Sequence, residues 1–205
     1  MNRAELIDTL ESWDAKKRRV FTVNDLRQLF PNDTELTFRN GLQRFSDGEN
    51  PILKRAARGV YVYGRSRFPW THAPEEIART LRRDHHVYVS LESALSEHGL
   101  ISQIPIDTLT LVTTGRPGSF TTAWGTIEFV HTGRDLPQFV DHLRDVGRPL
   151  PLATPALALG DLRRNARNLH LVRNLGDIET EATALPAPGS REVAAQQEAH
   201  DEPFL

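Results

Sequence analysis

The stretch ILKRAARGVYVYGR, residues 52–65, predicts a β-hairpin with a basic turn. Residues 60–63 alternate valine and tyrosine, as half-buried strands do, and residues 52–53 begin the strand before them. Arg58 and Gly59 lie at the turn, where glycine adopts a positive φ without steric cost. Because successive side chains point to opposite faces of a strand, only one of the two pairs, the valines or the tyrosines, is expected to face a core.

Three short amphipathic helices are expected before this hairpin. The first covers residues 2–15, the second lies between Thr22 and Pro31, and the third runs to about Asp47. Capping pairs are predicted for two of them, Thr22 with Asp25 for the second helix and Asn32 with Glu35 for the third. The apolar faces of the three helices are Leu6, Ile7, Leu10 and Trp13; Leu26, Leu29 and Phe30; and Phe38, Leu42 and Phe45. Three helices followed by a basic hairpin predict a winged helix-turn-helix, with the hairpin as its wing.

The third helix is expected to read DNA bases. At 100° per residue, Asn40 and Gln43 lie opposite its apolar stripe, and Arg39 and Arg44 lie on the flanks. Asn and Gln side chains pair with adenine and Arg pairs with guanine, while basic wing residues contact phosphates. The predicted DNA-binding residues are Thr37, Arg39, Asn40, Gln43, Arg44, Lys54, Arg55 and Arg58. Each of them could equally be a solvated side chain, and winged helices also dock proteins, so the prediction depends on the whole set.

Charge is distributed unevenly along the 205 residues, whose formal net charge is −2. Residues 1–70 carry 13 Lys and Arg against 9 Asp and Glu, which favours a polyanionic partner for this part. Residues 177–205 carry seven acidic residues and one Arg and are rich in Ala, Pro, Gly and Gln, so a disordered acidic tail is predicted. The chain has no cysteine and no apolar run near the ~20 residues of a membrane span, so we expect a cytoplasmic protein without a membrane partner.

A second, mixed domain is predicted behind a Pro-rich junction at residues 66–74. Its expected helices cover residues 75–83, 91–98, 136–146 and 156–168, and its expected strands cover residues 109–113 and 126–130. Residues 87–89 form a short apolar stretch. Because these elements do not alternate as regular βαβ units, an α+β domain is predicted. The predicted organisation is a winged helix-turn-helix at residues 1–66, an α+β domain at residues 74–176 and a disordered acidic tail at residues 177–205.

Catalytic patterns in the sequence are weak. The Asp-His-His run at residues 84–86 is found in phosphoesterases, but here it follows a helix end, where histidine also suits the helix dipole. Residues 115–119 are Gly-rich but lack a Walker lysine, so a loop is predicted there. A metal site could be assembled from His98 and His131 with Glu92 or Glu128, although buried structural histidines are commoner. We therefore expect no enzymatic activity, no metal and no other cofactor.

Two stretches of the second domain carry a family resemblance. YVSLESALSEHGLIS at residues 88–102 and LTLVTTGRPGSFTTAWGTIEFVHT at residues 109–132 resemble the AbiEi family of abortive infection, the antitoxin component of type IV toxin–antitoxin systems. The matching positions are Ser90, Glu92, Ser93, Ala94, Leu95, His98, Gly99, Leu100, Gly125, Ile127, Phe129 and His131. A later element matches in part, at Ala153, Pro155, Ala158 and Asp161, whereas Ala156 and Leu157 replace a Glu-Lys pair.

The resemblance implies a specific function. Such an antitoxin represses its own operon by binding inverted repeats in the promoter. It also counteracts a nucleotidyltransferase-like toxin without forming a stable complex, through its second domain. The alternative is a winged-helix transcriptional regulator whose C-terminal domain senses a ligand, and this alternative predicts an enclosed apolar pocket in that domain.

Overall fold

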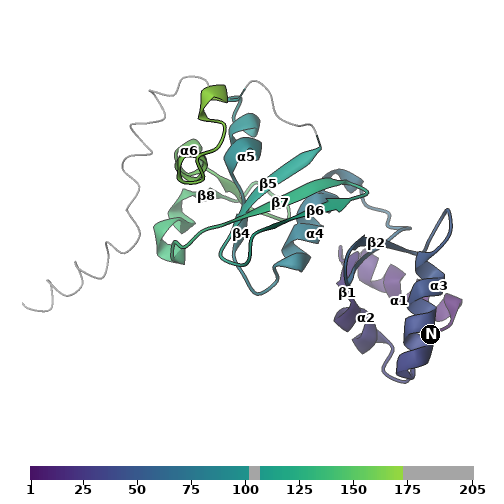
Figure 1. Cartoon of the computed structure of the whole chain (residues 1–205). Coiled ribbons are helices and arrows are strands. Elements are labelled where there is room, and N and C mark those ends of the chain that lie inside the picture. Colours follow the sequence, from purple (N-terminus) through teal and green to yellow (C-terminus); the bar gives the residue numbers. More distant parts are fainter. Residues whose placement is uncertain (102–106, 173–205) are drawn as a thin grey trace, which may run out of the picture.

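The computed structural model describes residues 1–101 and 107–172, which form a mixed α+β structure with two sheets (Figure 1). We call residues 1–66 the front unit and the described residues from 73 onward the rear unit. The predicted acidic tail at residues 177–205 lies outside the described residues.

The front unit contains three helices and a small antiparallel sheet. Its elements are α1 (Arg3–Ala15), β1 (Val20–Thr22), α2 (Val23–Leu29), α3 (Glu35–Ser46), β2 (Leu53–Ala57) and β3 (Val60–Tyr63). The strand order is β1-β3-β2, and Gly59 at the hairpin turn has φ 77°, as expected from the sequence. The capping box of Thr22 and Asp25 is confirmed. The predicted cap at Asn32 is wrong: α3 begins at Glu35, so Thr34 precedes it and accepts from the backbone N–H of Thr37.

Both faces of the three-stranded sheet are buried. Tyr63 packs with the apolar faces of α1, α2 and α3 in the front core, whereas Val62 packs with Ile77 of the rear unit. Tyr63 is 1% exposed and Val62 is 0% exposed. Only the tyrosine pair faces the three front helices, as expected, and helix α4 covers the valine face.

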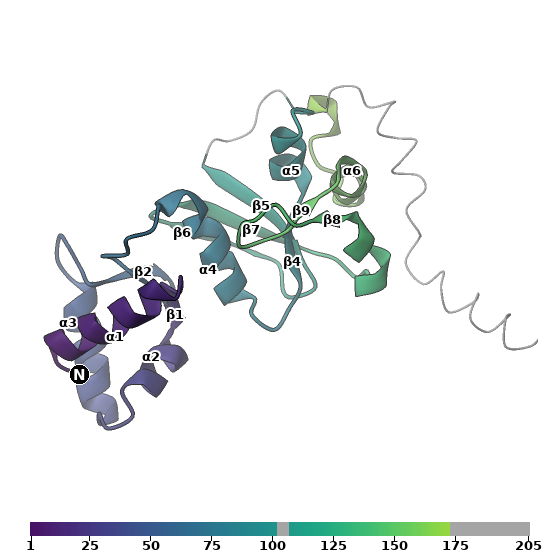
Figure 2. The same ribbon diagram turned by 180° about the vertical axis from the view of Figure 1, so that it is seen from behind.

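The rear unit is built on a six-stranded mixed sheet. Its elements are α4 (Ala73–Leu81), β4 (Val87–Val89), α5 (Leu91–Glu97), β5 (Thr108–Thr113), β6 (Gly118–Thr122), β7 (Gly125–His131), β8 (Leu143–Arg144), β9 (Leu152–Ala153) and α6 (Pro155–Arg164). The strand order is β6-β7-β5-β4-β9-β8, with β5 parallel to β7 and β4 parallel to β9. Helices α5 and α6 lie together on one face of this sheet, and α4 lies on the other face, toward the front unit (Figures 1 and 2).

Three sequence expectations for the rear unit are wrong in detail. Strand β6 lies within residues 115–125, which were expected to be a loop. The helix predicted at residues 136–146 is replaced by two 3₁₀ turns, Leu136–Gln138 and Val140–His142, and then by β8, because Leu143 pairs with Ala153 in the sheet. Helix α6 ends at Arg164, before the predicted residue 168, because the following residues adopt left-handed backbone angles.

Candidate nucleic-acid interface

Helix α3 is fixed by its apolar face. Phe38, Leu42 and Phe45 are buried against the front core, as the sequence predicted. The turn before α3 is held by Arg27, whose guanidinium donates to the carbonyls of Phe30 and Asp33 at 2.6 and 2.9 Å. The same guanidinium lies 5.5 Å from the ring centroid of Phe38. These contacts set the angle between α2 and α3, so the outer face of α3 is presented rigidly.

The outer face of α3 carries unpartnered polar groups. The side chains of Arg39, Asn40 and Gln43 are exposed and form no hydrogen bond or ion pair with any described residue. Leu36, in the first turn, is 70% exposed. Leu36 was not among the residues predicted to bind DNA, although its helical angle, opposite Phe38, already indicated exposure. This face therefore offers amide and guanidinium donors beside an apolar side chain, which are the groups that contact base edges and thymine methyls.

The other two predicted residues of α3 are engaged within the front unit. The hydroxyl of Thr37 lies 2.9 Å from the hydroxyl of Thr34, as part of the helix cap. The guanidinium of Arg44 stacks 4.6 Å from the ring centroid of Phe45 and donates to the Met1 carbonyl at 3.4 Å. Both side chains thus lie against the protein rather than away from it.

The basic residues of the hairpin divide between the two faces of the sheet. Arg55 and Arg58 are exposed and have no hydrogen-bond or ion-pair partner among residues 1–101 and 107–172. Lys54 pairs across the sheet with Val62, on the side of α4, and its ammonium lies 5.7 Å from the ring centroid of Trp70. The structure therefore leaves the two arginines free on the hairpin and turns Lys54 toward the rear unit.

The hairpin is short and tied down at its tip. Its two-residue turn is bound to the start of α2, because the backbone N–H of Val23 donates to the Gly59 carbonyl at 2.9 Å. Arg58 beside this turn is consequently held close to the body of the front unit.

In the rear unit, Asp161 is the centre of a buried polar network. Its carboxylate accepts from the Tyr88 hydroxyl at 3.1 Å and from the Ser90 hydroxyl at 2.8 Å, and it forms an ion pair with Arg134. Burial, followed by the charge of Asp161, raises the pKa of the Tyr88 hydroxyl, which therefore stays a donor. Ser90 precedes α5 as predicted, but its hydroxyl serves this network instead of capping the helix.

A second cluster joins Arg167 to the two carboxylates that were considered as metal ligands. The guanidinium of Arg167 donates to Glu92 at 2.9 Å and to Glu128 at 2.5 and 3.0 Å. Hydrogen bonds to Glu128 chiefly, and to Glu92, raise the pKa of Arg167. His98 and His131 are hydrogen-bonded to backbone carbonyls instead of to these carboxylates. A ring nitrogen of His98 lies 2.9 Å from the Ala153 carbonyl, and a ring nitrogen of His131 lies 2.8 Å from the Gly115 carbonyl. Within the described residues, no group of three or more His, Asp or Glu side chains is arranged to hold a metal ion.

The run at residues 84–86 follows α4, as the sequence indicated, and its side chains are exposed. The His86 ring lies edge-on to Phe139, with 6.2 Å between the centroids. Among the described helices, none combines the length and the apolar character needed to cross a membrane.

Comparison with known proteins identifies a structure with a similar fold but no matching family. No family model matches the chain, and no curated protein matches it. Among solved structures, the crystal structure of the RV2827C protein from Mycobacterium tuberculosis is similar, with a TM-score of 0.54 and 14% sequence identity. The match covers 87% of this chain and 68% of that chain, so the mixed α+β arrangement is shared across both units.

Proposed function

We propose that this protein is a DNA-binding antitoxin of the type IV class, with a winged helix-turn-helix as its front unit. The observation that carries the DNA-binding part is the unpartnered set of Arg39, Asn40 and Gln43 on the outer face of α3. The order helix, strand, helix, helix, hairpin, with the first strand paired beside the last, supports the winged-helix interpretation.

The free groups of the front unit have two different roles in this proposal. Asn40 and Gln43 read adenine and Arg39 reads guanine, because their amide and guanidinium groups match the base edges of the major groove. Leu36 adds an apolar contact for a thymine methyl group. Arg55 and Arg58 contact phosphates, which position the protein without reading sequence.

The antitoxin part of the proposal depends on the sequence resemblance of the rear unit. Among the residues that carry this resemblance, Ser90, Glu92 and Asp161 form internal hydrogen bonds. We infer that these residues maintain the fold and that toxin neutralisation uses exposed residues of the same unit.

The DNA-binding proposal is tested with the full chain. Residues 1–66 are unsuitable as a fragment, because Val62 and its neighbours on the sheet would lose their cover from α4. A duplex from the region upstream of the gene and an unrelated duplex are titrated at several salt concentrations. Asn40→Ala and Gln43→Ala should each weaken binding to the upstream duplex by about 5- to 150-fold, the equivalent of about 1–3 kcal/mol, and leave binding to the unrelated duplex unchanged.

The hairpin arginines should behave differently. Changing Arg55 and Arg58 together to Ala should weaken binding to both duplexes and reduce the slope of log affinity against log salt by about 0.9 for each lost phosphate contact. Arg144→Ala, which removes an exposed charge at the far edge of the rear sheet, is the matched control and should change neither quantity. Equal behaviour of the α3 and hairpin variants on the two duplexes would contradict the assignment of base-reading and phosphate-binding roles.

The antitoxin part is tested by co-expression with a nucleotidyltransferase-like toxin encoded beside the gene. The triple variant Arg39→Ala, Asn40→Ala, Gln43→Ala is expressed from an unrelated promoter, so that repression of the natural operon cannot contribute. We expect this variant to relieve growth arrest as well as the unmodified protein does. If protection is lost while the protein remains folded, the assignment of neutralisation to the rear unit is wrong.

A further inference from the structure

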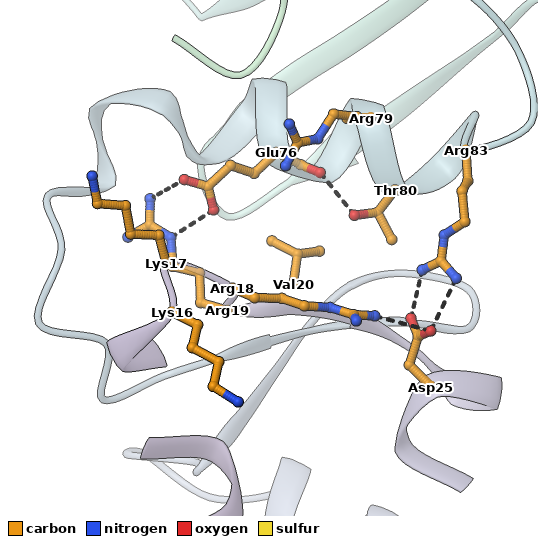
Figure 3. A pocket seen from close by; sticks show the side chains of 10 residues that line it. All are labelled: Lys16, Lys17, Arg18, Arg19, Val20, Asp25, Glu76, Arg79, Thr80 and Arg83. Atoms are coloured by element: carbon orange, nitrogen blue, oxygen red, sulfur yellow. Dashed lines mark hydrogen bonds and ion pairs between the residues drawn. The ribbon is translucent and has the colours of Figure 1, made fainter. Parts of the chain in front are cut away.

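A cationic pocket of about 660 Å³ lies between the front and rear units (Figure 3). Its lining residues are Lys16, Lys17, Arg18, Arg19, Val20 and Asp25 from the front unit and Glu76, Arg79, Thr80 and Arg83 from α4. Six cationic and two anionic side chains thus line the pocket. In Figure 3 the ammonium groups of Lys16 and Lys17 point apart from each other. The volume of the pocket lies within the range of small-molecule sites, about 300–1,000 Å³.

The carboxylate of Glu76 forms an ion pair with Arg19 that is part of the fold. The guanidinium of Arg19 is 2% exposed and donates twice to Glu76, at 2.7 and 2.8 Å. The same guanidinium donates to the carbonyls of Phe68 and Pro69 at 2.8 and 2.9 Å. Arg19 is therefore a fixed part of the junction between the units and has no free donor for a ligand.

The other carboxylate is shared by two arginines. Arg18 lies 3.0 Å from Asp25, and Arg83 donates to both oxygens of Asp25 at 2.6 and 2.9 Å. Figure 3 shows the two guanidiniums converging on this carboxylate from opposite units. Burial raises the pKa of Asp25, but hydrogen bonds from Arg83 and Thr22 outweigh it and hold the pKa below its ordinary value. Asp25 is therefore charged and neutralises one of the two arginines.

Three further cations have no carboxylate partner among the described residues. Lys17 and Arg79 form no side-chain hydrogen bond or ion pair with those residues, and Lys16 lies 5.0 Å from the ring centroid of Trp13. Arg18 and Arg83 together exceed the charge of Asp25 by one, and Arg19 balances Glu76. With Lys16, Lys17 and Arg79, the pocket therefore carries a formal charge of +4. Lys16, Lys17 and Arg79 are exposed. Like charges gathered around one hollow repel one another, and a bound polyanion relieves that repulsion.

The backbone of Lys17 is held in a strained conformation beside the pocket. Lys17 has φ 61°, in the left-handed region, directly after α1. Its N–H donates to the Asp14 carbonyl at 2.8 Å, and the Arg18 N–H donates to the Trp13 carbonyl at 3.0 Å, which is the Schellman end of a helix. Glycine is the usual residue at this position, because a side chain there costs free energy. Leu91, Ala166 and Asn168 also have left-handed φ values, and Lys17 differs from them in lining the cationic pocket.

We propose that this pocket binds a small ligand that carries two or three linked phosphate groups. Several excess charges suit linked phosphates better than one phosphate, and guanidinium groups bind phosphate oxygens in a bidentate manner. The phosphates of bound DNA are a poorer fit, because the pocket lies on the α4 side of the three-stranded sheet and α3 packs on the opposite side. Because both units line the pocket, the ligand would hold them together.

The test uses the full chain and inorganic phosphates, without DNA. Tripolyphosphate, pyrophosphate and orthophosphate are titrated by isothermal calorimetry at constant ionic strength. We expect one tripolyphosphate per chain, bound at least about tenfold more tightly than orthophosphate. Lys17→Gly and Arg79→Ala should each weaken tripolyphosphate binding by about tenfold or more, because each removes a charged donor. Lys17→Gly suits the local backbone, so loss of binding by this variant cannot be attributed to unfolding.

Two controls distinguish the pocket from general attraction to cations. Arg144→Ala removes one exposed charge from the rear unit and should leave tripolyphosphate binding unchanged. Lys17→Gly and Arg79→Ala should bind the upstream DNA duplex as the unmodified protein does. The proposal is overturned if Arg144→Ala weakens tripolyphosphate binding equally, or if the pocket variants lose DNA affinity as α3 variants do. A protein that binds tripolyphosphate in this pocket but fails to bind the duplex would refute the proposed function and leave this inference intact.

Discussion

The outer face of α3 and the network around Asp161 use similar side chains in opposite ways. On α3, Arg39, Asn40 and Gln43 have no partner among the described residues. The carboxylate of Asp161, which is 3% exposed, accepts hydrogen bonds from Tyr88, Ser90 and Arg134. Buried polar groups must be paired, because leaving one unpaired costs the full penalty of its lost hydration. Polar side chains that remain free are therefore the better indicators of an external partner.

This difference changes how the resemblance to antitoxins should be used. Ser90, Glu92, His98 and Asp161 carry part of that resemblance, yet each is bonded within the rear unit. Under the proposed function these residues maintain the fold, and the proposed neutralising surface consists of exposed residues of the same unit.

The largest effect is expected when the buried network is broken. Asp161→Ala leaves Arg134 as an unpaired buried charge, so the free energy of unfolding should fall by about 3–5 kcal/mol. The corresponding fall in Tm is about 6–20 °C for a protein of this size, measured by thermal unfolding followed by circular dichroism. Arg144→Ala, an exposed change in β8 of the same unit, should alter Tm by less than about 2 °C. A small effect of Asp161→Ala would show that the network is not essential for the fold.

The next largest effect tests whether the two regions belong to one cooperative structure. Ile77 on α4 is fully buried and joins the core that includes Val62 of the front sheet. Ile77→Ala should lower the free energy of unfolding by about 2–5 kcal/mol. Hydrogen exchange should then accelerate in β3 of the front unit as well as in β7 of the rear unit.

Leu36→Ala is the control for this experiment. It removes the same kind of apolar side chain from a site that is 70% exposed, and it should leave exchange unchanged. If Ile77→Ala accelerates exchange in the rear unit alone, the front unit folds independently, and the two regions can be studied as separate fragments.

Local signals account for the parts of the fold that the sequence predicted well. The capping box at Thr22 and Asp25, the turn at Gly59 and the apolar stripe of α3 depend on neighbouring residues, and the structure has all three. Long-range packing decided the rest. The apolar spacing of residues 136–146 imitates a helix, but Leu143 pairs with Ala153, and Leu136 stays exposed.

Two further features had no clear signal in the sequence. Strand β6 lies at the edge of its sheet, and its residues are mostly exposed, so its polar composition looked like a loop. The cationic pocket combines residues 16–19 with Arg79 and Arg83, which come together because α4 packs on the front sheet. Each half of the pocket looked like an ordinary basic helix end when it was considered by itself.

A smaller effect sharpens the description of α3. Thr34→Ala removes the side chain that accepts from the Thr37 N–H and should lower the free energy of unfolding by about 1 kcal/mol. Asn32→Ala changes the residue that the sequence suggested as the cap, and it should have almost no effect. Chemical denaturation of the two variants measures both values. A larger loss of unfolding free energy for Asn32→Ala than for Thr34→Ala would show that α3 is capped by Asn32, as the sequence predicted.

The smallest effect is a gain in stability at the cationic pocket. Lys17→Gly relieves about 1–2 kcal/mol of left-handed strain and costs about 0.4–1 kcal/mol of chain entropy, so the unfolding free energy should rise by about 0.5 kcal/mol. Lys16→Gly makes the same chemical change at a residue with φ −89°, where no strain is relieved, and should lower stability by about 0.4–1 kcal/mol. Denaturant titrations measure the change in the free energy of unfolding for each variant. Changes of opposite sign would show that backbone strain is stored at Lys17 and not at Lys16. If Lys17→Gly also loses tripolyphosphate binding, the protein retains a destabilising residue because the ligand requires its charge. Equal losses of stability from both variants would show that no strain is stored at Lys17 and would remove the backbone argument for a binding role.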